Sequence, residues 1–339
     1  MSRHRRTQAM VDDLVRALGP GPWTPNDLIA LGWTSAQVRQ AVVVGRLVRP
    51  HRGVVDLPRG PDDESGFVAR ARAALLRAGT AAVASHTTAA RLHGLWLPSR
   101  VDATIHLTWP GEPDRHDHGV RIHGSALPAD HVGEAEGIAV TSLARTAVDS
   151  ARGRTLRDAL VVLDSSARRA ALDVDPGGRR LQESSSWRIE VNAAARHRLG
   201  AVLASECAWP GTVVVRDALP SLDASSESPL ESWSRGLMIE SGLPLPEVAY
   251  AVQGASGRRY FSDFAWPCHR VLGEADGRAK YGLSGIDVTR ALGAERRRQR
   301  DLEAAGWTVV RWDSTESPQA VTRRVAAALS ARPTRTSLT

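Results

Sequence analysis

Carboxylates near the end of the chain are spaced so that they could hold a divalent cation. Asp263 and Glu274 fall on two strand-like runs, 259–266 and 269–276, which a short turn joins. Such a hairpin can bring both carboxylates to one face of a sheet, and Asp276 shares that face with Glu274 because side chains alternate along a strand. Carboxylate oxygens bind Mg2+ or Mn2+, and the metal ion can activate water against a phosphodiester. These residues therefore predict hydrolytic nuclease chemistry.

Two further residues, Lys280 and Glu231, could complete such a site. Lys280 follows the turn after Asp276 and is the single lysine among 44 basic residues. Its compact charge could stabilise the negative charge that develops on a phosphate. Glu231, on a helix predicted over 226–241, could join the metal shell directly or through water.

The same residues also have structural explanations, which the sequence leaves open. Glu231 stands three residues after Ser228 and fits a capping box that would only satisfy a helix end. The dipeptide that begins at Asp276 is a favoured turn, and the single lysine can be a matter of chance. Asp263 and Glu274 could instead form ordinary ion pairs with the guanidinium groups of Arg259, Arg278 and Arg298.

The elements that must position these acids follow from hydrophobic periodicity and turn signals. The segment 224–331 is predicted as a helix, three strands, a helix, a strand and a helix. The helices are expected over 226–241, 289–305 and 316–328, and the strands over 247–252, 259–266, 269–276 and 307–312.

The first sixty residues predict three short helices and a two-stranded ribbon. The first helix is expected over 7–18, the second after the N-cap Thr24, and the third after a capping-box pattern over 34–37. The turn at Gly32 gives the second and third helices helix-turn-helix spacing. Residues 46–56 then alternate apolar and basic side chains around a turn, which is typical of a DNA-binding wing. The alternative is a small helical bundle whose arginines are merely solvated.

In a winged helix, the third helix lies in the major groove and basic residues around it meet phosphates. Its outward-facing residues are expected to be Ser35, Gln37, Arg39 and Gln40, with the two glutamines placed to meet base edges. The expected phosphate contacts are Arg39, Arg46, Arg49 and Arg52.

The middle of the chain, residues 61–220, shows no chemistry in its sequence. Helices are expected over 64–78, 85–94, 142–151 and 156–171, strands over 101–109 and 119–123, and a polar loop over 173–186. Seven histidines lie here without paired helical spacing or accompanying carboxylates, so we expect solvated or hydrogen-bonded side chains and no metal site. They are His86, His93, His106, His116, His118, His123 and His131.

Composition narrows the class of protein. A chain of 339 residues is expected to form two or three domains, and 42% hydrophobic residues are enough for real cores. The net charge of +7 and a pI near 10.4 favour a polyanionic partner, with nucleic acid first. No run of about 18 apolar residues is present, and the two cysteines do not suit a disulfide framework or a zinc site. We therefore expect a cytoplasmic protein without a membrane partner.

Four motifs in the C-terminal segment are ESPLES at 227–232, YFSDFAW at 260–266, EADGRAKY at 274–281 and QRDLEAAGWTVVRW at 299–312. With them the segment resembles the uncharacterised endonuclease-like domain related to very-short-patch-repair endonucleases, in the PD-(D/E)xK restriction-endonuclease-like superfamily. The resemblance implies a mixed four-stranded sheet flanked by helices and Mg2+-dependent DNA cleavage. It assigns Asp263 and Glu274 to the acidic positions and Glu231 to the helix acid. The superfamily lysine would stand where this chain has Asp276, so Lys280 would supply its charge from a displaced position.

The N-terminal segment 24–55, TPNDLIALGWTSAQVRQAVVVGRLVRPHRGVV, is similar to the winged-helix domain of the AbiEi family of antitoxins from type IV toxin-antitoxin systems. The stretches ASHTTAARLHGL at 84–95 and GIAVTSLARTAVDSA at 137–151 are similar to the region after that domain in such antitoxins. In the family, the antitoxin represses its own operon through the winged helix, and a cognate toxin is its partner.

Together these features predict a multidomain α/β (α+β) protein with three parts and a tail. A winged helix-turn-helix is expected over 1–60, a central antitoxin-like α/β region over 61–220, a restriction-endonuclease-like mixed sheet over 224–331 and a disordered tail over 332–339. The leading function is Mg2+- or Mn2+-dependent hydrolysis of DNA. The alternative is a non-catalytic transcriptional regulator or antitoxin that uses the nuclease-like domain as a binding platform.

Overall fold

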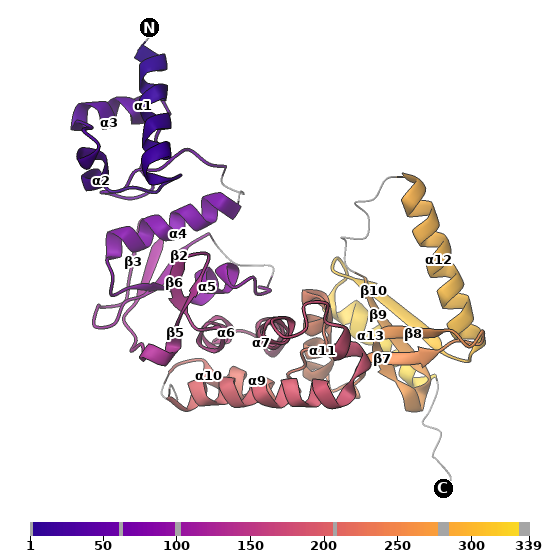
Figure 1. Cartoon of the computed structure of the whole chain (residues 1–339). Coiled ribbons are helices and arrows are strands. Elements are labelled where there is room, and N and C mark those ends of the chain that lie inside the picture. The colour runs from indigo at the N-terminus through magenta and orange to yellow at the C-terminus, as the bar shows by residue number, and fades with distance from the viewer. Residues whose placement is uncertain (1–2, 61–63, 99–102, 206–208, 277–284, 332–339) are drawn as a thin grey trace. The chain divides into compact units, whose positions relative to one another are not determined.

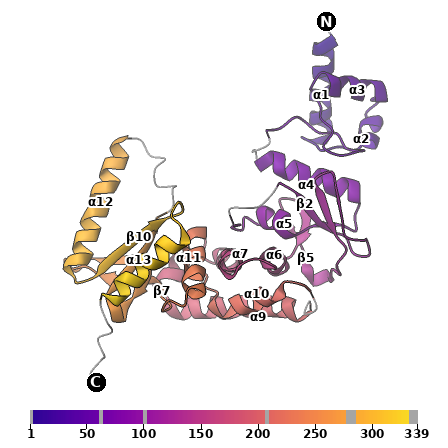
Figure 2. The same ribbon diagram turned by 180° about the vertical axis from the view of Figure 1, so that it is seen from behind.

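The protein is an α+β chain that forms two compact units. The structure, a computed structural model, describes residues 3–60, 64–98, 103–205, 209–276 and 285–331 (Figures 1 and 2). Helices and two mixed sheets make up the fold, so the α+β class predicted from the sequence is confirmed. One unit comprises residues 1–93 and 100–146, and the other comprises residues 94–99 and 147–339. The predicted central region, 61–220, therefore contributes to both units. In the described ranges, no helix combines the length and the apolar character needed to span a bilayer.

The first unit begins with three helices, two of which have starts fixed by side-chain caps. They are α1 (Arg3–Leu18), α2 (Pro25–Ala30) and α3 (Ser35–Val43). Reciprocal capping boxes begin α2 and α3, with Thr24 paired to Asp27 and Thr34 to Gln37, as the second and third predicted helices require. These boxes satisfy backbone N–H groups that have no partner inside the helix.

Three short extended segments complete this N-terminal region. Trp23 pairs antiparallel with Val55, and Val48 pairs antiparallel with Asp56, so residues 48–56 form a hairpin that closes against the segment before α2. One core holds the helices and the hairpin together; it consists of Val11, Leu14, Trp23, Leu28, Trp33, Ala41, Leu47 and Val55.

The first unit continues with a six-stranded mixed sheet. The helices are α4 (Glu64–Ala78), as predicted, and α5 (His86–Leu92). The strands are β1 (Val83–Ala84), β2 (Ile105–Thr108), β3 (Arg115–Asp117), β4 (Val120–His123), β5 (Val132–Ala135) and β6 (Ile138–Thr141), with a 3-10 turn at Ala129–His131. Their order in the sheet is β3-β4-β2-β1-β6-β5. Alternate residues of β2 and β4, among them Leu107 and Ile122, pack against Phe67 of α4 and Ala89 of α5. The intervening residues of β2 and β4 consequently face the other side of the sheet.

In the second unit, the described residues up to 240 form mainly helices. Its helices are α6 (Leu143–Ala151), in which the division between the units falls, α7 (Leu156–Leu172), α8 (Arg179–Glu183), α9 (Ser185–Ser205), α10 (Thr212–Ala218) and α11 (Pro229–Glu240), with a 3-10 turn at Leu219–Ser221. Every residue from Ala159 to Ala167 is buried, so α7 packs on all sides as the central helix of this unit. The polar loop predicted over 173–186 is wrong in part, because α8 and the start of α9 lie there.

A four-stranded sheet between helices forms the rest of the second unit. The elements are β7 (Glu247–Gln253), β8 (Arg259–Trp266), a 3-10 turn at Pro267–His269, β9 (Val271–Asp276), α12 (Gly285–Ala304), β10 (Thr308–Asp313) and α13 (Pro318–Ser330), in the predicted order. The sheet order is β10-β9-β8-β7, with β10 parallel to β9 and the other pairs antiparallel. Phe264 and Trp312 pack with α11 and α13, whereas Ala265 and Leu272 pack with Leu302 of α12. The two helix layers therefore cover opposite faces of the sheet.

Gly236 permits the close approach of α11 to α7. A Cβ atom at Gly236 would lie 2.7 Å from Cβ of Arg157 and would also meet the backbone of α7. We expect Gly236→Ala to lower the free energy of unfolding by roughly 1–3 kcal/mol through overpacking. Gly200, inside α9, has open space around it, so Gly200→Ala should raise the same quantity by about 1 kcal/mol. Urea unfolding of both variants measures the contrast, and equal effects would contradict it.

Candidate functional site

The predicted acidic pair lies on adjacent strands of the C-terminal sheet. Phe264 of β8 is paired with Gly273 of β9, and one further step of this antiparallel register places Asp263 opposite Glu274. Asp263 also accepts a hydrogen bond from the backbone N–H of Ala275 (2.7 Å). The sequence therefore placed these two carboxylates correctly on one face, which is the face that α12 covers.

Glu274 is buried and held by two neighbours. Both of its oxygens accept hydrogen bonds from Arg298 of α12 (2.8 and 3.3 Å), and Ser262 donates to one of them (3.0 Å). Burial, and next the nearby charge of Asp263, raises the pKa of Glu274 from its ordinary 4.5 to about 7, although Arg298 opposes the shift. The ion pair with Arg298 is one of the structural alternatives that the sequence left open. The site thus holds a carboxyl group that exchanges a proton near neutral pH.

Asp276 lies at the end of β9, on the same face as Glu274. It forms an ion pair with Arg311 of β10 (3.2 Å), and Arg311 also binds Glu295 of α12. Lys280, expected to stabilise a phosphate, lies outside the described residues, as does the predicted tail over 332–339. On the α12 side of this sheet, Glu274 and Asp276 are therefore each paired with an arginine.

Glu231 belongs to the start of α11. Ser228 caps the helix, because its hydroxyl accepts a hydrogen bond from the backbone N–H of Glu231 (3.2 Å). The Glu231 carboxylate accepts from that hydroxyl through Oε1 (2.7 Å) and from the backbone N–H of Glu227 through Oε2 (2.7 Å), so it helps to order this helix end, although the bond is one residue away from that of a reciprocal capping box. Within the described ranges, Glu231, Asp263 and Glu274 are not among the residues whose ligand atoms gather within 4.8 Å as a group of three. Glu231 therefore belongs to the helix end and does not join the group of Asp263 and Glu274.

The predicted DNA contacts lie on α3 and on the hairpin. The side chains of Ser35, Arg39 and Gln40 are exposed on α3, and those of Arg46, Arg49 and Arg52 are exposed on the segment that comes next. Gln37 is only half-exposed, and its side-chain carbonyl oxygen accepts the hydrogen bonds of Thr34 in the capping box. A hollow in the surface is lined by Ser35 and Arg39 from the helix and by Arg49 and Gly53 from the hairpin. Arg39 of the helix and Arg49 of the hairpin thus border the same hollow.

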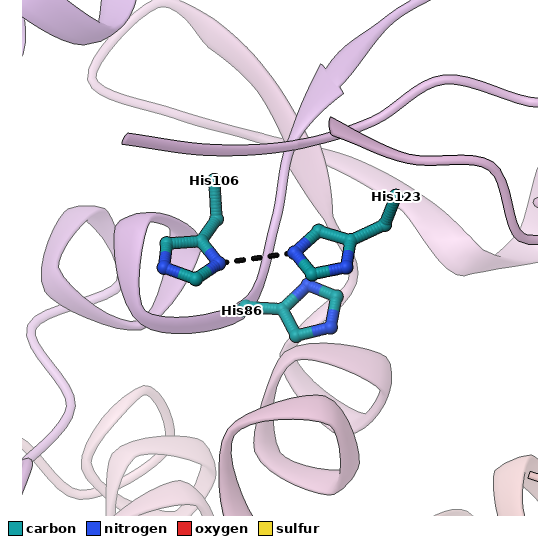
Figure 3. Close-up of side chains that lie close together, drawn as sticks. All are labelled: His86, His106 and His123. Atoms are coloured by element: carbon teal, nitrogen blue, oxygen red, sulfur yellow. Dashed lines mark hydrogen bonds between the residues drawn. The ribbon is translucent and has the colours of Figure 1, made fainter. Parts of the chain in front are cut away.

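Three of the seven histidines come together, which the sequence did not predict. His86, His106 and His123 offer nitrogen atoms that all lie within 4.8 Å of one another (Figure 3). The three side chains come from separate elements, and the parallel pairing of β2 with β4 brings His106 and His123 together. No local spacing in the sequence signals this pairing. The other histidines differ: His93 contacts the backbone carbonyl of Thr141 (2.8 Å), and His116 is exposed.

The fold and these sites define an α+β protein that has a basic helix-and-hairpin surface and a sheet with paired carboxylates. Comparison with known proteins gives its family. The uncharacterized proteins MT2308 and Rv2248, from two strains of Mycobacterium tuberculosis, are each 30% identical to this chain over 280 residues, which is 82% of this chain and 89% of each relative. The chain belongs to the same family as these two proteins.

Two further comparisons add little to this assignment. No family model matches the chain. The crystal structure of the RV2827C protein from Mycobacterium tuberculosis is 16% identical and aligns with a TM-score of 0.40, over 73% of this chain and 88% of that chain.

Proposed function

We propose that the protein binds duplex DNA through a winged helix formed by residues 3–56. Three helices with an extended segment between the first two, followed by a hairpin that pairs with that segment, support this assignment. In such a module α3 enters the major groove, where Ser35, Arg39 and Gln40 reach the bases and phosphates. The net charge of +7 adds a favourable long-range attraction to the DNA.

The observation that carries this proposal is the common hollow of the helix and the hairpin. Arg39 of α3 and Arg49 of the hairpin line it together, beside Gly53 at the tight turn between His51 and Val54. A helix that inserts into the groove therefore brings the hairpin arginines to the flanking phosphates. Two separate basic patches would not share a single duplex in this way.

Removing one of these arginines should weaken binding and reduce its salt dependence. We expect Arg39→Ala and Arg49→Ala each to lower the affinity for duplex DNA roughly 5- to 10-fold and to reduce the slope of log K against log salt by about 1, because one phosphate contact is lost. Arg216→Ala removes the same charge from the exposed surface of α10 and serves as the control. Fluorescence anisotropy over a salt series measures both quantities. If all three variants lose the same affinity, binding does not reside in this hollow.

A second function, metal-dependent hydrolysis of DNA, is favoured by the pairing of Asp263 with Glu274. Two carboxylates side by side supply the oxygen ligands and the negative charge that Mg2+ or Mn2+ takes. A bound ion of this kind would supply Lewis-acid activation of water against the phosphodiester. Arg298, which holds Glu274, and Arg311, beside Asp276, add positive charge for the phosphate.

A nicking assay tests this second function. We expect supercoiled plasmid to be nicked in Mg2+ or Mn2+, with no nicking in EDTA, and we expect Asp263→Ala and Lys280→Ala to lose the activity. Asp217→Ala removes an exposed carboxylate of α10 and should leave it unchanged. Binding of plasmid without cleavage would instead favour the non-catalytic regulator or antitoxin, which works with a cognate toxin and uses the C-terminal sheet as a binding platform.

A further inference from the structure

Three histidines converge on one side of the six-stranded sheet. His106 of β2 and His123 of β4 lie on the face opposite the apolar core, because their neighbours Ile105, Leu107 and Ile122 face that core. His86, the first residue of α5, joins them from the chain segment just after β1. All three side chains are buried or half-buried.

Their rings are in direct contact. A hydrogen bond joins Nδ1 of His106 to Nε2 of His123 (3.0 Å), and the ring of His86 stacks on that of His123 with 3.7 Å between centroids (Figure 3). His86 takes a positive φ of 50°, a conformation that non-glycine residues rarely adopt and that recurs at functional sites. Ser85 Oγ lies 3.0 Å from Nδ1 of His86 and can fix the orientation of that ring.

The three imidazole nitrogens are a set of ligand atoms that a transition-metal ion can use. The hydrogen bond between His106 and His123 needs one ring to donate and the other to accept, so at least one imidazole is neutral. Among the described residues, the group whose ligand atoms gather within 4.8 Å consists of three histidines. Ligand nitrogens around a tetrahedral ion lie about 3.3 Å apart when the metal-nitrogen bonds have their usual length. The observed 3.0 Å between two of them is close to this spacing, and binding an ion requires the stacked rings to rotate until their in-plane lone pairs meet at it.

A buried hydroxyl beside the histidines points to a further ligand. Thr108 is fully buried, and its Oγ1 has no hydrogen-bond partner among the described residues. It lies two residues after His106 on the same face and directly opposite His123 in the β2–β4 register. Buried polar groups normally have a partner. Three nitrogen ligands leave one tetrahedral position open, and a water molecule or anion bound there would give this hydroxyl a partner.

We propose that His86, His106 and His123 bind one borderline transition-metal dication of the Zn2+ class, with a water molecule or anion as the fourth ligand. Imidazole nitrogens favour Zn2+, Co2+, Ni2+ and Cu2+, whereas Mg2+ and Ca2+ take oxygen ligands. This site is separate from the acidic pair of the C-terminal sheet and does not depend on DNA binding or hydrolysis.

Titration of the full-length, chelator-treated protein with Zn2+ and Co2+ tests the proposal. We expect one ion bound per chain in competition with a chromogenic chelator, visible absorption bands of tetrahedral Co2+, and a higher melting temperature with Zn2+. His106→Ala and His123→Ala should each weaken binding by more than about 100-fold, since loss of a residue that only supports a ligand already costs about 10- to 100-fold. Mg2+ should produce none of these changes.

The control variant is His116→Ala, which removes an exposed histidine of β3 outside the group. It should bind Zn2+ like the wild type. His106→Gln keeps a polar side chain of similar size in case the alanine variant does not fold, and circular dichroism in the absence of metal checks this. Unchanged Zn2+ affinity in folded His106 and His123 variants, or no stoichiometric binding by the wild type, would overturn the metal site and leave a stack of hydrogen-bonded neutral imidazoles.

Discussion

Asp164→Ala is expected to lower the free energy of unfolding by about 3–5 kcal/mol, because it leaves a buried guanidinium without its partner. Asp164 of α7 is fully buried and binds Arg235 of α11, itself only 6% exposed. Its other oxygen accepts the backbone N–H of Asp223 (2.9 Å), so it also holds the loop before α11. Burial raises the pKa of Asp164 and the charge of Arg235 opposes this shift, so each group depends on the other.

Chemical denaturation of the variant beside a matched control measures this effect. Asp173, at the end of the same helix, forms an exposed ion pair with Arg169 (3.0 Å), and Asp173→Ala should change stability by no more than about 1 kcal/mol. Arg235→Met should cost less than Asp164→Ala, because a lone carboxyl group can take up a proton whereas a guanidinium cannot lose one. Similar small losses for Asp164→Ala and Asp173→Ala would show that the buried pair does not stabilise the fold.

Elements with local signals could be predicted from the sequence. The helix from Glu64 to Ala78 and the strand from Arg259 to Trp266 have the predicted bounds, because apolar periodicity marks both. The capping box that begins at Thr34 and the N-cap bond of Ser228 are formed, since the four residues that begin at each contain the groups involved. A local pattern therefore predicted these elements without knowledge of the fold.

Elements that depend on distant contacts could not be predicted. The strand Val83–Ala84 has only two residues and exists because β2 and β6 flank it. Helix α9 buries the polar Asn192 beside Leu199 and leaves Ile189 exposed, so the pattern of apolar residues does not mark its buried face. Asp164 and Arg235 are 71 residues apart, and nothing near either residue indicates a buried partner.

The two candidate sites also differ in whether local or distant contacts form them. Asp263 and Glu274 share one hairpin, so alternation along the strands was enough to place them side by side. His86, His106 and His123 come from three elements, and only the parallel register of β2 with β4 brings the last two together. A search for helical spacing between histidines has no access to that register. The placement of the two carboxylates, which depends on one hairpin, was therefore predicted, and the convergence of the three histidines, which depends on distant contacts, was not.

The raised pKa of Glu274 should make stability fall as pH rises toward neutrality. Its pKa is about 7 in the folded protein, against an ordinary value of 4.5. Between these two values the folded chain binds the proton more tightly than the unfolded chain does, so the contribution of Glu274 is complete below about pH 4.5 and is lost as pH rises through 7. The total amounts to about 3 kcal/mol. Glu274→Gln cannot titrate and should lack this part of the pH dependence.

The wild type and Glu274→Gln should therefore be compared by urea unfolding from about pH 4.5 to about pH 7.5 in EDTA. We expect the stability of the variant relative to the wild type to rise by about 3 kcal/mol across this range. Glu183→Gln removes an exposed carboxyl group of α8 and controls for the loss of one acid. A constant difference between Glu274→Gln and the wild type would mean that Arg298 keeps Glu274 ionised throughout, as in an ordinary ion pair. A rising difference would mean that ionised Glu274 is unfavourable in the folded protein, because it is buried beside Asp263. The positive charge of a bound dication would reduce this cost and so add stability.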